Sequence, residues 1–188
     1  MRNFILVLAL LTFGGLSLNA SEKIEGKSQS TTAFSSVYTD FSDEYCETSD
    51  EGAESGSDSP MKCKGIGGYK VSVWYNTYGH EIASVNSLDG DFSTTLTKDG
   101  CGATHNYGGR LEWRLANGNP FACIIRITCL EEDEGGGLSP SRKVGEYLLV
   151  KGLKGYGGKD FEVDVGRTKN PNERARELAD ENYLNFSQ

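Results

Sequence analysis

Five cysteines and two histidines are the residues of this chain best suited to chemistry. The cysteines are Cys46, Cys63, Cys101, Cys123 and Cys129. A catalytic serine or cysteine needs an oriented base beside it, and neither His80 nor His105 lies in a nucleophile-elbow or cysteine-protease context. Cys101 and His105 are close in sequence, but a cysteine of an exported chain more often forms a disulfide. We therefore assign no catalytic residue.

Metal and carboxylate chemistry finds little support in the ligand spacing. Zinc sites use short pairs such as C-x-x-C with histidine support, and His80-Glu81 lacks the second histidine of H-E-x-x-H. The acidic stretch 47–60 lacks the ligand register of an EF-hand loop. The sequence predicts neither a metal nor a cofactor. In a glycoside hydrolase, the distance between the two catalytic carboxylates is set by the tertiary fold and leaves no spacing pattern in the sequence. A hydrolase acting on envelope polymers is therefore an alternative.

The first 20 residues have the pattern of a secretory signal peptide, with Arg2, a short apolar run and a small residue, Ala20, before the cleavage point. The run is too short to span a bilayer. We therefore predict a periplasmic or secreted protein without a membrane anchor after cleavage. Removing Arg2 changes the formal charge from -8 to -9. Such an acidic chain repels phosphate backbones, which argues against nucleic-acid binding.

Export to an oxidising compartment makes disulfides the expected state of the cysteines. Cys46 and Cys63 bracket the acidic loop, and we expect them to bond and to add about 3 kcal/mol of stability. Cys123 and Cys129 share one face of a predicted strand but lie about 20 Å apart along it, too far to bond each other. Cys101 therefore pairs with either one, and the remaining cysteine is free, buried or intermolecular.

The element around which we expect the rest of the chain to fold is a β-hairpin at residues 109–128. Its first arm alternates, with Leu111, Trp113 and Leu115 on one face. The turn at 116–120 contains Asn-Gly. The second arm, 121–128, is so rich in apolar and β-branched residues that we expect it to be buried on both sides.

The remaining elements give an α+β fold that is mostly β: a single antiparallel-sheet domain with a C-terminal helix and disulfides. Residues 21–34 are predicted to be a disordered leader, and residues 35–188 to form the domain. At 70–75, Lys70, Ser72 and Trp74 alternate with Val71, Val73 and Tyr75. Further strands are predicted at 80–85, 92–97, 144–151 and 159–165.

A helix is predicted at 171–186. Asn170 is a good N-cap, Pro171 suits the first helical position and Glu173 completes a capping-box pattern. Five residues share one face at helical spacing and should pack on the sheet. They are Ala175, Leu178, Ala179, Tyr183 and Phe186.

Three blocks, Cys63-Lys-Gly-Ile-Gly-Gly-Tyr-Lys-Val, Leu111-Glu-Trp-Arg-Leu with Pro120-Phe-Ala, and Asn170 to Asp180, carry a resemblance. On them the chain resembles a family of small secreted proteins of Gram-negative bacteria without an assigned function. The resemblance implies an extracytoplasmic location and no activity. Members of that family carry a cysteine near their last residues, whereas this chain ends Asn185-Phe-Ser-Gln.

Recognition is the function class that these observations favour. Tyr107 and Arg110 lie in one glycine-containing segment and Tyr156 in another, and we expect exposed tyrosines there to form a contact surface. The first hypothesis is a non-enzymatic binding or inhibitory module of the cell envelope with a protein partner, such as a basic lytic enzyme. The alternatives are a hydrolase acting on envelope polymers and a structural envelope component.

Overall fold

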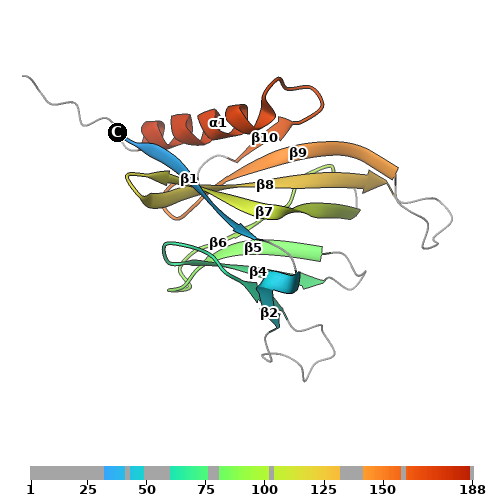
Figure 1. The fold of residues 1–188 in the computed structure, drawn as a ribbon, viewed down its shortest axis with the longest axis horizontal. Coiled ribbons are helices and arrows are strands. Elements are labelled where there is room, and N and C mark those ends of the chain that lie inside the picture. The colour runs from blue at the N-terminus through green and yellow to red at the C-terminus, as the bar shows by residue number, and fades with distance from the viewer. Residues whose placement is uncertain are drawn as a thin grey trace, which may run out of the picture. The chain divides into compact units, whose positions relative to one another are not determined.

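The structure is a computed structural model, and it describes residues 32–40, 43–48, 60–75, 81–101, 104–131, 142–157 and 160–186. These residues form two five-stranded antiparallel sheets and a C-terminal helix (Figure 1). The predicted α+β, mostly β class with disulfides is confirmed, although there are two sheets where the sequence predicted one. The predicted signal peptide, residues 1–20, lies outside the described residues.

The first sheet, here called sheet A, contains the predicted hairpin. Its strands, in spatial order, are β1 (Phe34–Asp40), β7 (Thr104–Ala116), β8 (Asn119–Glu131), β9 (Arg142–Gly152) and β10 (Phe161–Asp164). The hairpin turn uses Asn117 and Gly118 at φ 50° and 84°, the left-handed region that this residue pair tolerates.

Strand β1 shows that the predicted leader ends too late. Phe34 begins the strand and pairs with Ala116 of β7, and its ring packs edge-on against Phe121 with centroids 5.8 Å apart. Residues 32–34 therefore belong to the domain. The rest of the predicted leader, 21–31, lies outside the described residues.

The second sheet, sheet B, has the order β2 (Cys46–Thr48), β3 (Met61–Cys63), β4 (Tyr69–Tyr75), β5 (Glu81–Ser87) and β6 (Ser93–Thr95). A short 3-10 helix, η1 (Asp43–Tyr45), leads into β2. Strands β4, β5 and β6 match predicted strands. Strands β2 and β3 were not predicted, because three residues are too few for an alternating pattern.

The main core lies between the two sheets. Trp113 and Leu111 of β7 pack with Val71 and Val85 of sheet B, and all four side chains are buried. A second core lies on the other face of sheet A, under the helix. Because sheet A is covered on both faces, its central strand β8 is apolar at successive positions, as predicted for residues 121–128.

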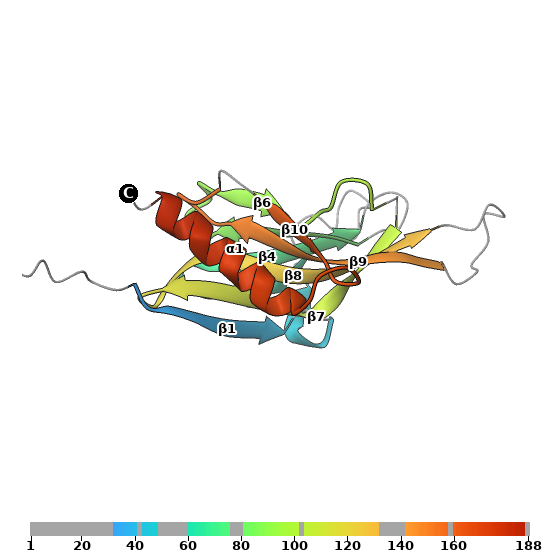
Figure 2. The ribbon, with the colours of Figure 1, turned by 90° about the horizontal axis from the view of Figure 1, so that it is seen from above.

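Helix α1 (Pro171–Phe186) has the predicted bounds and packs against β9 and β10 of sheet A (Figure 2). Ala175 and Ala179 are buried, but Phe186, in the last turn, is 47% exposed, so its predicted packing is wrong. The buried residue near that end is Asn182, whose side-chain amide donates to the Tyr156 carbonyl at 3.2 Å. Within the described residues, no helix is long and apolar enough to cross a membrane.

Two disulfides stabilise the fold. Cys46 and Cys63 face each other across β2 and β3 and are bonded, which confirms the predicted pair. Cys101 bonds to Cys129 of β8, one of the two pairings that the sequence left open. Cys123 is then the free cysteine, fully buried in the core between the sheets.

The burial of Cys123 predicts its reactivity. Desolvation raises the pKa of this thiol to about 12, so almost no thiolate is present at neutral pH. We expect no thiol to react with a maleimide in the native, non-reduced protein, and one thiol per chain to react in guanidinium chloride. Mass spectrometry counts the adducts. Labelling of the native protein, or a different number of adducts after unfolding, would contradict the pairing.

Candidate binding face

Tyr107 is a link between the two sheets. The sequence predicted an exposed tyrosine on a loop, which is wrong, because Tyr107 lies within β7 and packs against the core. Its hydroxyl donates to the Leu96 carbonyl at 2.8 Å and accepts from the Ala83 backbone N–H at 3.2 Å. Burial raises the pKa of Tyr107 to about 12. This residue therefore joins sheet A to sheet B.

Replacing Tyr107 with phenylalanine should lower the free energy of unfolding by about 1–3 kcal/mol, because it leaves two backbone groups without this partner. The native tyrosine also makes stability depend on pH. Its pKa is raised from 10.0 in the folded state, so its contribution is present below pH 10 and is lost as the pH rises toward 12. Urea unfolding followed by circular dichroism should show a smaller alkaline loss in Tyr107→Phe. Equal stability of the two proteins at pH 7 would contradict this role.

The other two predicted contact residues lie in different surroundings. Arg110 is exposed on β7, with Nε 3.4 Å from the Asp40 carboxylate. Tyr156 is half-buried beside α1, stacked on Tyr183 with ring centroids 5.0 Å apart. The structure therefore does not bring the three residues together into one surface.

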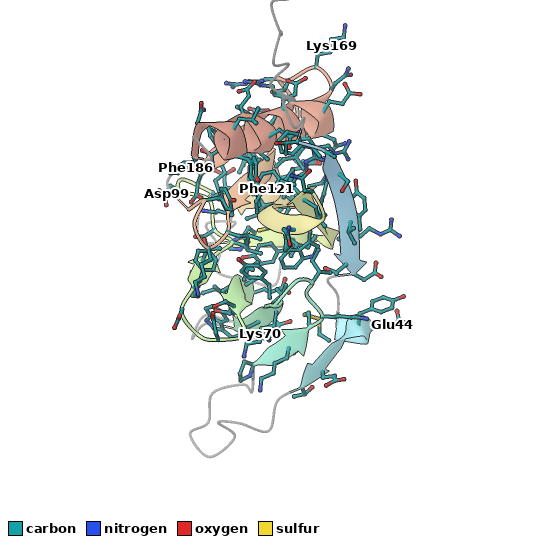
Figure 3. All side chains as sticks on the ribbon, turned by 90° about the vertical axis from the view of Figure 1, so that its left-hand side faces the viewer. Glu44, Lys70, Asp99, Phe121, Lys169 and Phe186 are labelled. Carbon is teal, nitrogen blue, oxygen red and sulfur yellow. A yellow bond between two sulfur atoms is a disulfide. The ribbon has the colours of Figure 1, made fainter. Side chains whose placement is uncertain are left out.

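A different surface, the outer face of sheet B, has the features of a binding site. We use this name for the face turned away from sheet A; Lys70 in Figure 3 marks it, on the side of sheet B far from α1. A hollow of about 470 Å3 lies on it, within the size range of ligand pockets. Its lining includes Lys70, Ser72, Trp74, Ser84, Asn86 and Ser93.

Strand alternation produces this face. In β4, Val71 and Val73 point into the core, so Ser72 and Trp74 point outward. Strand pairing then sets Ser84 of β5 opposite Ser72. The same pairing places polar side chains of three neighbouring strands side by side.

Asn86 holds the polar side chains of the hollow in place. Its side-chain amide donates to Ser72 Oγ at 3.1 Å and to Ser84 Oγ at 2.9 Å. Its carbonyl oxygen accepts from Ser93 Oγ at 2.7 Å. One amide side chain on β5 thus fixes hydroxyl groups from β4, β5 and β6.

Trp74 supplies an apolar surface beside this network. It lies opposite Ile82 in the pairing of β4 with β5 and is half-buried. The chain has two tryptophans, and the other, Trp113, is fully buried in the core. Trp74 is therefore the tryptophan that solvent or a ligand can reach.

A second hollow, of about 510 Å3, lies at the ends of β9 and β10 and is lined by charged residues. Its carboxylates are already neutralised. Glu146 accepts from Lys143 and Arg126, which lowers its pKa. Asp164 accepts from the backbone N–H groups of Gly166 and Arg167 at 2.9 and 3.0 Å. This hollow has the chemistry of a surface ion-pair network.

Among the described residues, no group of three or more histidine, cysteine, aspartate or glutamate side chains is arranged to hold a metal ion. His80 lies outside the described residues. In comparisons with protein-family models, with curated proteins and with solved structures, no match to the chain was found.

Proposed function

We propose that the protein is a non-enzymatic binding module that works outside the cytoplasm and holds its ligand on the outer face of sheet B. The observation that carries the proposal is the pairing of a half-buried Trp74 with a row of hydroxyls fixed by Asn86. Binding sites typically combine apolar surface with a few oriented polar groups. Because Asn86 orients the hydroxyls before a ligand arrives, less ordering is needed on binding.

The proposed location has separate support. Two disulfides in the structure are compatible with an oxidising compartment. The signal-peptide pattern of the first 20 residues and the resemblance to secreted proteins of Gram-negative bacteria support export to the periplasm or beyond.

Two described carboxyl groups, Asp89 and Glu146, are unsuited to act as the general acid of a hydrolase. A glycosidase needs one carboxyl group with a raised pKa as the general acid. The described carboxyl groups with a resolved pKa shift, Asp89 and Glu146, are shifted downward by lysine or arginine partners. Such groups stay ionised and donate no proton near neutral pH.

The acidic charge of the chain favours a second candidate, in which the ligand is a basic protein such as a lytic enzyme. The formal charge is -8 before signal cleavage. A complex of this kind would form faster at low ionic strength and weaken as salt is added. Loss of a captured basic protein when the salt is raised would favour this candidate over a ligand held by polar and apolar contacts.

The test is capture from envelope extracts by the immobilised, oxidised mature chain at low and moderate salt. Trp74→Ala removes the proposed contact, and Leu184→Ala is the matched control, since Leu184 is an exposed apolar residue on α1. We expect one component, protein or polysaccharide, to be retained by the native chain and Leu184→Ala and to be lost by Trp74→Ala. Equal retention by all three proteins would contradict the proposal.

A further inference from the structure

We infer that the ligand of the outer face of sheet B is an uncharged saccharide chain; this inference rests on the binding role proposed above. A pyranose ring has a face of C–H groups and an edge of hydroxyl groups. A site for it needs an aromatic surface for the face and fixed hydrogen-bonding groups for the edge. Both are present within one hollow of this protein.

Trp74 matches the face of the sugar. The faces of an aromatic ring carry negative partial charge, so they attract the weakly positive C–H hydrogens of a sugar ring. Tryptophan offers the largest ring system and keeps a rigid position at little entropic cost. Trp74 is half-buried and lines the hollow, so part of its ring is within reach of a ligand.

The serines match the edge of the sugar. A hydroxyl group has one proton and two lone pairs, and the contact with Asn86 occupies only one of these positions on each serine. Ser72, which accepts from Asn86, can therefore both donate to a sugar hydroxyl and accept from one, whereas Ser93, which donates its proton to Asn86, can only accept. They lie on β4 and β6 with β5 between them, so their spacing follows twice the strand separation of about 4.8 Å, and a chain of rings can contact them in sequence.

The charges beside the hollow and the overall charge of the chain disfavour an acidic ligand. Among the described residues that line it, Lys70 is the only one with a charged side chain. Its ammonium group is a hydrogen-bond donor for a sugar hydroxyl. Asp89 and Asp91, in the turn beside the hollow, are paired with Lys154. An acidic polymer would meet these carboxylates and the overall charge of -8.

A protein partner fits the hollow less well. Stable protein interfaces bury about 800 Å2 on each partner around a dry apolar centre. Here Trp74 and the apolar side chains of Pro60, Leu88 and Phe92 share the lining with serine and asparagine side chains that hydrogen-bond to one another. A ligand rich in hydroxyl groups can hydrogen-bond to these polar side chains while its apolar face covers the apolar ones.

The test starts with the oxidised mature chain on a broad glycan array, followed by calorimetric titration with the best-bound oligosaccharide. We expect a neutral oligosaccharide to bind, Trp74→Ala and Asn86→Ala each to lower its affinity at least tenfold, and Trp74→Phe to keep part of it. Leu184→Ala should bind as the native chain does. Circular dichroism of each variant checks that the fold is kept.

The outcomes separate this inference from the function on which it rests. If no neutral glycan binds, or only acidic ones do, the inference is overturned, while a protein captured through Trp74 would keep the binding role. If a neutral glycan binds equally well to Trp74→Ala and Asn86→Ala, the assigned site is wrong. If neither glycans nor envelope extracts supply a ligand that depends on Trp74, both proposals fail.

Discussion

Replacing Trp113 with alanine is expected to lower the free energy of unfolding by about 3–5 kcal/mol, the usual cost of removing a large buried aromatic ring. Trp113 lies in the core between the two sheets with no exposed surface. Its indole N–H also donates to Thr39 Oγ1 of β1 at 2.9 Å. The substitution therefore leaves a cavity between the sheets and removes a side-chain link to an edge strand.

Urea unfolding followed by circular dichroism measures this loss without relying on the removed fluorophore. Trp74→Ala is the control of equal chemical size, and we expect it to cost less than half as much, because Trp74 is only half-buried. Trp113→Phe is a milder variant in case the alanine protein does not fold. Similar losses for the two alanine variants would contradict the assignment of Trp113 to the core and Trp74 to the outer face.

Removing the Cys101–Cys129 disulfide is expected to cost about 3–4 kcal/mol in the chain-entropy model. The bond closes a segment with a sequence separation of 28 and ties the chain that follows sheet B to β8 of sheet A. Alanine is the preferred replacement at both positions, because both cysteines are buried in the core and a hydroxyl there would need a partner.

The matched comparison is the double alanine variant at Cys46 and Cys63. The disulfide that it removes closes a shorter segment, with a sequence separation of 17. The entropic model predicts a smaller loss for this pair, and its strands lie at the edge of sheet B. Thermal and urea unfolding under non-reducing conditions give both values. A Cys101–Cys129 variant as stable as the native chain would contradict the structural role of this disulfide.

Local patterns were enough to predict the elements that carry their own signals. The hairpin of β7 and β8 has alternating residues and an Asn-Gly turn, and α1 has a capping pattern and an apolar face. Strand β1 has no such signal. It lies at the edge of sheet A, and its partner β7 is distant in sequence, so its pairing depends on tertiary contacts. The division into two sheets could not be predicted for the same reason, because local sequence patterns do not show which strands pair with each other.

Tyr107 was misread because of the two glycines that follow it. In the structure, the register of β7 against β8 shifts between Tyr107 and Leu111, so the pairing is irregular at the two glycines although the strand continues. A Cβ atom on Gly108 would lie 3.0 Å from Cβ of Arg126, so glycine there permits close strand packing. Glycine pairs usually indicate a loop, and this pattern led to the wrong prediction for Tyr107. Here both glycines lie inside the long strand β7.

The candidate site was only half visible in the sequence. The alternation in β4 marked Lys70, Ser72 and Trp74 as one face, and such faces are usually ordinary solvent-exposed surface. What distinguishes this face is Asn86, and its contacts with serines on three strands depend on the register of β4, β5 and β6. Register is a tertiary fact, so the sequence alone could not assemble this site.

The central claim is that the ligand covers Trp74, and acrylamide quenching of tryptophan fluorescence tests it most directly. Trp113 has no exposed surface and should resist quenching, so in the free protein the quenched emission should come from Trp74. We predict that saturating amounts of the oligosaccharide identified on the array will protect this emission, and that Trp74→Ala will show little quenching with or without it. Unchanged quenching of the native chain when the oligosaccharide is bound would contradict the claim.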